Sequence, residues 1–103
     1  MITEIVYFKL TPGITREGAL DKYLTTAQKW SQNADLVRKY YFFDAEKSLG
    51  GGVYIWKDLA SAHKWHGQEY RDMIKKLYGS EPDITCMETL VVVDNVAGTI
   101  TEP

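Results

Sequence analysis

Two neighbouring segments of the chain are rich in strand-forming residues: Leu36–Asp44, which reads LVRKYYFFD, and Val53–Lys57, which reads VYIWK. Aromatic and β-branched side chains favour the extended backbone of a sheet. The glycines Gly50–Gly52 interrupt the chain between them, so we expect the two strands to form a hairpin. A sheet with one covered face alternates apolar and polar positions, whereas these segments carry bulky groups on both faces. Both faces of the predicted sheet therefore need a cover.

An apolar segment and an amphipathic helix precede these strands. Ile2–Leu10 carries only two charges and predicts a strand, which Pro12 and Gly13 end. Thr15 is suited to cap the N-terminus of a helix that ends near Ser31–Asn33. Its apolar positions recur at helical spacing: Leu20, Tyr23, Leu24, Ala27 and Trp30.

A second helix and a last strand follow the hairpin. Asp58 is a good N-cap, and Gly79 is suited to end a helix that runs to about Tyr78. A strand is expected near Thr85–Val93, and the tail Asp94–Pro103 is expected to be irregular. The stripe on the helix consists of Ala62, His66, Met73 and Leu77, flanked by Tyr70 and Ile74.

The element order is strand, helix, strand, strand, helix, strand. This βαββαβ order predicts a ferredoxin-like α+β fold, a four-stranded antiparallel sheet with two helices on one face. We expect a single domain over residues 1–95 and a tail over 96–103. Two helices cover only one sheet face, and monomers rarely leave a large apolar patch in water. We therefore expect a homodimer packed through the second sheet face.

Composition and charge exclude several classes of protein. The 103 residues are 45% hydrophobic and 25% charged, as in an ordinary globular domain. Twelve Lys and Arg against 14 Asp and Glu give a net charge of -2, which argues against a nucleic-acid partner. The lone Cys86 leaves no disulfide framework. No secretory signal and no apolar run of ~20 residues is visible, so a cytoplasmic protein without a membrane partner is expected.

Several segments of the chain resemble the dimeric α/β-barrel superfamily, and within it the YdhR-like group of monooxygenases, cousins of the antibiotic-biosynthesis monooxygenases. The resemblance spans nearly the whole chain. It rests on Thr11–Gly13, Leu36–Tyr41, Gly51–Trp56, Asp58 with Ser61 and Ala62, Tyr78–Pro82 and Val92–Asn95.

This resemblance implies a dimer with one cavity per subunit, between the sheet and its helices. Related enzymes oxygenate anthrone- or quinol-like aromatics without flavin, haem or metal, so the resemblance implies no cofactor. Trp56 matches the family tryptophan, which implies a catalytic or substrate-positioning role. Haem-degrading relatives share the spacing of Trp56 and Trp65, but their haem ligand falls near Lys75 here, and lysine does not ligate haem iron at its ordinary pKa.

His66 is the first candidate for chemistry because it lies mid-stripe on the second helix. A neutral imidazole facing a cavity is suited to accept a proton from a phenol or an anthrone. The alternative is a buried histidine whose nitrogens are satisfied by a backbone carbonyl or a tyrosine. His63, His66 and Glu69 are three residues apart, but the outer two diverge by ~120° around a helix, so we expect no metal site.

Aromatic and cationic side chains supply the candidates for ligand binding. Trp65, Tyr54 and Tyr70, together with Trp56, are suited to stack on a planar aromatic molecule, or else they pack the core and the dimer interface. Arg38 is suited to hold an enolate or a carboxylate. Its alternative is a salt bridge with Glu88 or Asp94.

Three functions remain open at this stage. The first is a cofactor-independent monooxygenase acting on a small aromatic substrate, with His66 as general base. The second is a non-catalytic dimeric protein that binds small hydrophobic molecules. The third is an isomerase or a decarboxylase that uses a similar base without oxygen.

Overall fold

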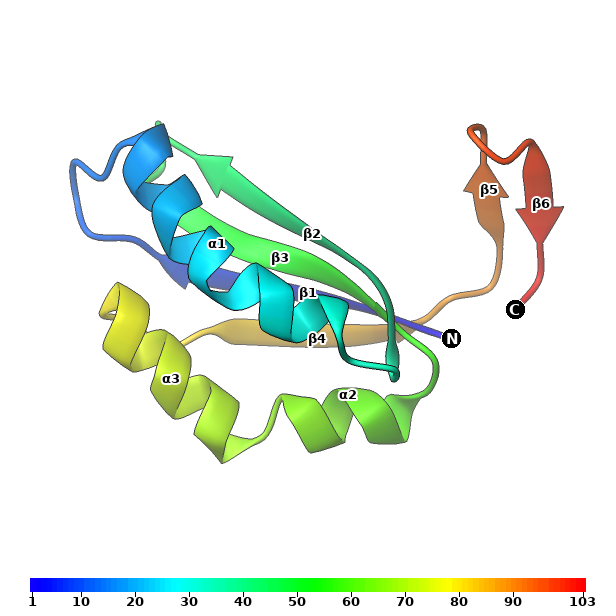
Figure 1. The fold of residues 1–103 in the computed structure, drawn as a ribbon. Helices are drawn as coiled ribbons and strands as arrows, with labels where there is room; N and C mark the ends of the chain where they lie inside the picture. The colour runs from blue at the N-terminus through cyan, green and yellow to red at the C-terminus, as the bar shows by residue number, and fades with distance from the viewer.

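The computed structural model describes residues 1–103 (Figure 1). It has the predicted βαββαβ order, except that the second helix is divided into two and a short β-hairpin follows the last predicted strand. Its elements are β1 (Ile2–Lys9), α1 (Arg16–Ser31), β2 (Leu36–Asp44), β3 (Leu49–Trp56), α2 (Leu59–Trp65), α3 (Gln68–Tyr78), β4 (Asp83–Glu88), β5 (Val92–Asp94) and β6 (Thr99–Thr101). The first four strands form one antiparallel sheet in the order β2-β3-β1-β4. The helices lie on one face of this sheet. The ferredoxin-like α+β fold is confirmed.

Both predicted helix N-caps are present. The Thr15 hydroxyl accepts a hydrogen bond of 3.0 Å from the Gly18 N–H, and an Asp58 carboxylate oxygen accepts one of 2.8 Å from the Ser61 N–H. Gly79 ends α3 with a φ of 85°, which favours glycine. Short polar side chains thus start two helices and a glycine ends the third, as the sequence pattern predicts.

The apolar stripe of α1 differs from its prediction. Ala19, Tyr23 and Trp30 are buried, whereas Leu20 and Leu24 are 41% and 60% exposed. The two leucines lie toward the open edge of the sheet at β2, which no further strand covers. Helical spacing identifies the apolar side of α1. Only the part of that side that faces the sheet, and not the part beyond its edge, is buried.

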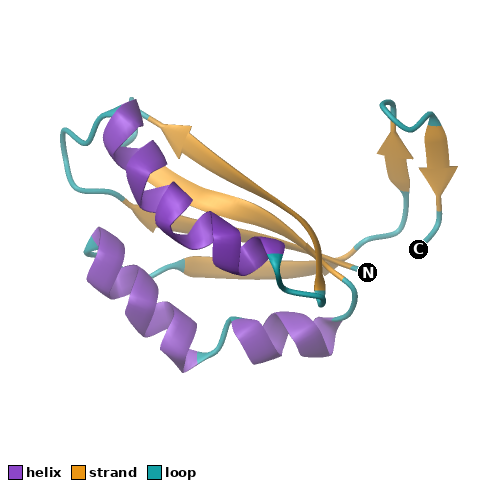
Figure 2. Ribbon diagram, viewed as in Figure 1, coloured by secondary structure: helices purple, strands orange, loops and turns teal.

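The predicted second helix is broken at His66 and Gly67, between α2 and α3 (Figure 2). The His66 N–H donates the last hydrogen bond of α2, to the Ala62 carbonyl at 3.0 Å. Glycine is a poor helix former, and Gly67 has an extended backbone here. Because of this break, a different set of α3 side chains faces the core: Tyr70, Ile74 and Tyr78 are buried. Met73 and Leu77, which the sequence pattern predicts to be buried, are only half-buried.

The glycine run lies inside strand β3 rather than before it. A Cβ atom on Gly51 would lie 1.9 Å from the Val6 carbonyl oxygen, and one on Gly50 would lie 2.4 Å from the Tyr23 hydroxyl. That hydroxyl accepts a hydrogen bond from the Gly51 N–H (3.2 Å) and donates one to the Phe42 carbonyl (2.9 Å). The glycines therefore make room for the side chain by which α1 docks on the sheet.

The C-terminal part of the chain forms a separate hairpin. The predicted strand near Thr85–Val93 is split, because β4 ends at Glu88 and β5 pairs only with β6. The expectation of an irregular tail is therefore wrong over Thr99–Thr101. Figure 1 shows this hairpin standing away from the four-stranded sheet. Its apolar side chains Val93, Val96 and Ile100 are exposed.

The two faces of the sheet have different surroundings. The helix-covered face carries the buried core, which includes Val6, Phe8, Tyr54 and Trp56. Successive side chains of a strand point to opposite faces, so the other face carries Ile5, Tyr7, Tyr40, Phe42, Val53, Ile55 and Met87. Tyr40 is 53% exposed there, and Tyr7 is 40% exposed. No helix of the structure has both the length and the apolarity to cross a membrane.

Substitution of Gly51 tests the close approach of β3 to β1. We expect Gly51→Ala to lower the free energy of unfolding by about 3 kcal/mol, since the strands must move apart to relieve the overlap with the Val6 oxygen. Urea denaturation measures the change. Gly67→Ala is the matched control because its Cβ would meet only the His63 carbonyl, at 3.8 Å. Equal stability of the two variants would contradict this packing.

Candidate functional site

A carboxylate is buried on the helix-covered face of the sheet. Glu4 of β1 is 1% exposed and lies two residues before the core residue Val6. One carboxylate oxygen contacts Nδ1 of His66 and accepts a hydrogen bond of 3.0 Å from the Trp56 indole N–H. The other oxygen accepts one of 3.2 Å from the Cys86 thiol. Three elements thus converge on one charged group.

These contacts set the protonation states of the pair. Burial opposes ionisation of Glu4, but its hydrogen bonds with His66, Trp56 and Cys86 outweigh burial and lower the pKa of the carboxyl group. Burial lowers the pKa of His66, and the nearby carboxylate offsets this only in part. At neutral pH an uncharged imidazole therefore faces a carboxylate through Nδ1–H. Nε2 is left as a buried proton acceptor with no hydrogen-bond partner.

Aromatic rings enclose the imidazole. The ring of Tyr70 stacks on that of His66 with centroids 3.8 Å apart, and Tyr54 and Trp30 contact it edge-on at 4.4 and 5.6 Å. The hydroxyls of Tyr54 and Tyr70 share a hydrogen bond of 3.0 Å. Burial raises the pKa of both phenols, so they stay protonated. Trp56 also contacts the imidazole edge-on, at 5.3 Å, so three of the four predicted aromatic residues are brought together with the predicted histidine.

A small cavity lies between the sheet and the helices, where the resemblance places one. Its volume is about 10 Å³, which is room for about one water molecule. Its wall consists of Phe8, Tyr23, Thr26, Trp30, Lys39, Tyr41, Gly51, Tyr54, Tyr70, Met73, Ile74 and Tyr78. We call it the inner cavity. His66 and Trp56 are not part of its wall, since Tyr54, Tyr70 and Trp30 stand between His66 and the space.

Lys39 also lies in the wall of the inner cavity, although it is not among the site residues that the sequence predicts. Its Nζ lies over three ring faces, 3.7 Å from the centroid of Tyr41, 4.4 Å from that of Tyr54 and 5.0 Å from that of Trp30. It forms no ion pair and no hydrogen bond. Burial, together with the positive charge of Lys29, lowers the pKa of Lys39 to about 6.

The alternation of side chains along a strand could have identified Glu4 and Lys39 from the sequence. Glu4 alternates with the inward-facing Val6 and Phe8, and Lys39 alternates with Tyr41 and Phe43. A charged residue in phase with a buried stripe is uncommon in a strand, so the pattern alone marks both positions for inspection.

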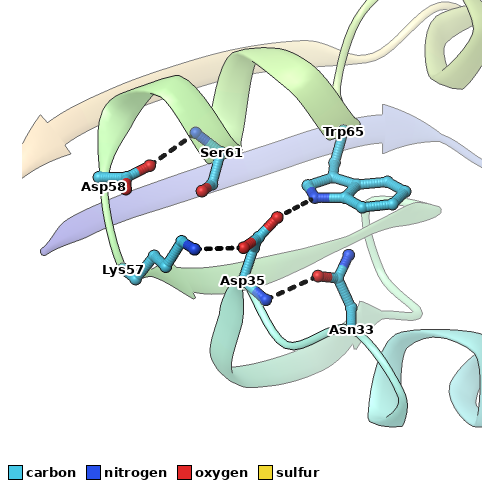
Figure 3. A network of polar contacts seen from close by, with 6 residues as sticks. All are labelled: Asn33, Asp35, Lys57, Asp58, Ser61 and Trp65. Carbon is cyan, nitrogen blue, oxygen red and sulfur yellow. Dashed lines mark hydrogen bonds and ion pairs between the residues drawn. The ribbon is translucent and has the colours of Figure 1, made fainter.

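Trp65 lies outside the inner cavity and belongs to a polar network, shown in Figure 3. Its indole N–H donates a hydrogen bond of 2.9 Å to Asp35, whose carboxylate also pairs with Lys57 Nζ at 2.5 Å. The side chain of Asn33 accepts a hydrogen bond from the Asp35 N–H at 2.9 Å. This network ties the loop after α1 to α2 and fixes the indole. Trp65 then lines an open groove of about 500 Å³ beside Lys64.

Arg38 also lies away from the inner cavity. A register shift in β2 between Leu36 and Arg38 turns its side chain outward, where Nη1 donates to the Tyr40 hydroxyl at 3.2 Å. It lines a groove of about 500 Å³ between the sheet and the C-terminal hairpin. Neither Glu88 nor Asp94 forms an ion pair with it. The hydrogen bond to Tyr40 raises the pKa of Arg38, and the charge of Asp94 adds to this effect.

The remaining titratable candidates show no site for a metal ion. No group of three His, Cys, Asp or Glu side chains lies close enough to hold one. His63 is exposed on α2. Burial and the contact with Glu4 raise the pKa of the Cys86 thiol to about 11, so it stays protonated.

Comparison with solved structures identifies proteins of the same fold. A "putative antibiotic biosynthesis monooxygenase" from Deinococcus radiodurans matches with a TM-score of 0.69 at 14% identity, over 91% of this chain and 97% of that one. A protein of unknown function from Nitrosomonas europaea, NE2512, matches with a TM-score of 0.68 at 17% identity, over 89% and 91%. No protein-family model matches the chain, and no curated protein matches it in sequence. The likeness confirms the ferredoxin-like α+β fold of the single chain.

The Glu4–His66 pair makes a prediction about stability and pH. The pKa of His66 is lowered on folding, so the unfolded chain binds more protons than the folded one below pH ~6.5. The free energy of unfolding should therefore fall as the pH drops from 7.5 to 5.5, by at most about 1.4 kcal/mol per pH unit for one proton. Glu4, whose pKa is also lowered, adds a loss at more acid pH. Denaturant unfolding at each pH measures this dependence.

The matched variants for this test are His66→Gln and His63→Gln. The first removes the buried imidazole and should flatten the dependence on pH. The second removes an exposed one and should leave it unchanged. A wild type whose stability is constant between pH 7.5 and 5.5 would contradict the uncharged state of His66.

Proposed function

We propose that the protein is a cofactor-independent monooxygenase-like enzyme that acts on a small anthrone- or quinol-like molecule between the sheet and the helices. The observation that carries this proposal is the buried Nε2 of His66, which has no partner while Glu4 holds Nδ1. A neutral histidine oriented by a carboxylate is a standard general base. The D. radiodurans protein of the same fold bears the name "putative antibiotic biosynthesis monooxygenase".

The proposed reaction begins with proton transfer to His66 Nε2. Glu4 keeps the imidazole in the tautomer that leaves Nε2 free and stabilises the imidazolium that forms. The electron-rich carbanion of the substrate then reacts with molecular oxygen. Conversion of a CH₂ group by one O₂ into a carbonyl and one water balances all atoms, so oxygen is the only oxidant required. The protein supplies the base, the orientation and a dry site.

Binding of a substrate requires the inner cavity to widen. Its volume of about 10 Å³ is far below the ~300 Å³ of ordinary ligand pockets. Tyr54 and Tyr70 are the side chains to displace, since they separate the cavity from His66 and their hydroxyls bond only to each other. We propose that the substrate ring takes over their contacts, while Trp56 positions Glu4 through its indole N–H. Trp65 and Arg38 would contact substrate only at the outer grooves.

A second candidate function is a non-catalytic protein that binds small hydrophobic molecules. It is favoured by the absence of His66 from the cavity wall, because a general base must come within hydrogen-bond reach of its substrate. An isomerase or a decarboxylase on the same scaffold would use the same base without oxygen. Oxygen consumption separates these possibilities from a monooxygenase.

We also propose a homodimer formed through the uncovered sheet face. Tyr7 and Phe42 pack there with ring centroids 5.4 Å apart, amid further apolar side chains that no helix covers. The exposed apolar residues of the β5–β6 hairpin extend this surface. A second copy of the chain brings the complementary apolar area. The proposal includes a cytoplasmic protein with neither a nucleic-acid nor a membrane partner.

Oxygen uptake tests the proposed chemistry. Purified protein is assayed with a panel of anthrones, quinols and hydroxynaphthoquinols against a blank without enzyme. We expect His66→Ala to lower the enzyme-dependent uptake by roughly 100-fold or more, since 100-fold is the lower end of the usual contribution of a general base. His63→Ala is the control and should retain full activity. Unchanged oxygen uptake in His66→Ala would show that His66 is not the general base. No uptake with any substrate would favour the non-catalytic protein that binds small hydrophobic molecules.

Light scattering tests the dimer. The expected mass is twice the 11.8 kDa of one chain. Tyr7→Glu places a charge on the uncovered sheet face and should yield monomers. Leu24→Glu places the same charge on α1, where Leu24 is 60% exposed, and should leave the dimer intact. A wild-type mass of 11.8 kDa would overturn the predicted sheet-to-sheet packing.

A further inference from the structure

We propose that Lys39, which lies between the inner cavity and an open groove, is a binding site for an acidic aromatic hydroxyl group: Nζ takes up the hydroxyl proton and holds the resulting aryloxide as an ion pair. This inference deepens the proposed function, on which its class of ligand rests. It assigns to the substrate a phenol-like hydroxyl group in addition to the proton that His66 would remove.

The position of Lys39 supports this assignment. It belongs to the wall of the inner cavity and also to that of an open groove of about 260 Å³ between α1 and β2. Lys39, Trp30 and Tyr41 are the residues common to both walls. They therefore separate the buried space from the surface. A planar molecule that enters from the groove meets the amine before it reaches the interior.

The surroundings of Lys39 Nζ are suited to an ammonium group that forms only when a ligand donates its proton. The faces of Tyr41, Tyr54 and Trp30 surround the amine and attract a positive charge. No carboxylate pairs with it. The titratable groups that face it are Lys29 from α1, Tyr41 and Tyr54 from the sheet, and Tyr70 and His66 from the second helical layer. All are neutral near pH 7 except Lys29, whose positive charge opposes protonation of Lys39.

Proton transfer to this amine is balanced in charge and in atoms. The O–H bond of the ligand breaks, an N–H bond to Nζ forms, and no electron is gained or lost. Without a ligand, burial keeps the amine uncharged, with a pKa of about 6. With a phenol bound, transfer creates two opposite charges side by side, which attract strongly where water is excluded. The net charge of the site does not change.

Lys39 and His66 lie around the same two rings. The centroid of Tyr54 is 4.4 Å from Lys39 Nζ and 4.4 Å from the His66 ring centroid. Trp30 lies 5.0 Å from the first and 5.6 Å from the second. A ligand ring that displaced Tyr54 would therefore come close to both an amine and an imidazole. The substrate class this arrangement fits is a planar aromatic with an acidic hydroxyl and a second labile proton.

A hydroxycoumarin reports the proton transfer directly, because its phenol and its aryloxide absorb at different wavelengths. The probe is 7-hydroxycoumarin at a pH one unit below its own pKa. We expect wild-type protein to convert one probe per chain to the aryloxide. Lys39→Met keeps the length of the side chain but lacks the amine, and should lose at least 10-fold in affinity and all of the aryloxide signal. Lys76→Met, on the exposed side of α3, is the matched control and should retain both.

Lys39→Arg distinguishes proton uptake from simple charge attraction. A guanidinium is always charged and cannot accept the proton. Calorimetry in two buffers of different ionisation enthalpy should show one proton released per probe bound by Lys39→Arg and none by the wild type. Circular dichroism and thermal unfolding of each variant confirm that its fold is retained.

Three results would overturn the assignment: binding of the probe only as the neutral phenol, an equal aryloxide signal in Lys39→Met, or no binding by the wild type. The assay needs no turnover, so it separates this inference from the proposed function. Formation of the aryloxide with no oxygen uptake from any substrate would support the Lys39 site and count against the monooxygenase.

Discussion

The ionised carboxylate of Glu4, enclosed in the protein interior, is the constraint on which the rest of the structure depends. A buried charge is tolerated only where hydrogen bonds replace the water it has lost. Its partners come from β3, β4 and the end of α2 through Trp56, Cys86 and His66. These contacts tie three elements to β1. The break between α2 and α3 lies at His66, the residue whose side chain reaches the carboxylate.

The same constraint shapes the chemistry of the interior. Because Nδ1 of His66 serves Glu4, Nε2 is left unpartnered in a shell of aromatic rings. Those rings close the inner cavity almost completely and also accommodate the amine of Lys39. Two proton acceptors with lowered pKa values are thus each held 4.4 Å from the ring centre of Tyr54. Desolvation keeps both neutral, which is a condition for accepting protons near pH 7.

Part of the candidate site was accessible from the sequence. His66, Tyr54 and Tyr70 were expected to lie together because they share an apolar helical stripe and the inward face of a strand, and the structure brings them into contact. Trp65 and Arg38 were expected near the same ligand, but they face outer grooves. A hydrogen bond to Asp35 holds the first, and a register shift in β2 turns the second. Neither this hydrogen bond nor this register shift can be predicted from the spacing of residues along the chain.

The fold follows from local information. Hydrophobic periodicity, the caps at Thr15 and Asp58 and the order of elements suffice to predict a ferredoxin-like sheet with helices on one face, since each depends on residues close in the chain. Long-range contacts set the rest: the glycines that receive Tyr23, the helix break at Gly67 and the pairing of β5 with β6. The pairing of Glu4 with His66 joins residues 62 positions apart. The lowered pKa of Lys39 depends on burial between α1 and the sheet and on the positive charge of Lys29 from α1. Burial and charge of this kind arise only when distant segments pack together, which is why the chemistry of the site becomes visible only in three dimensions.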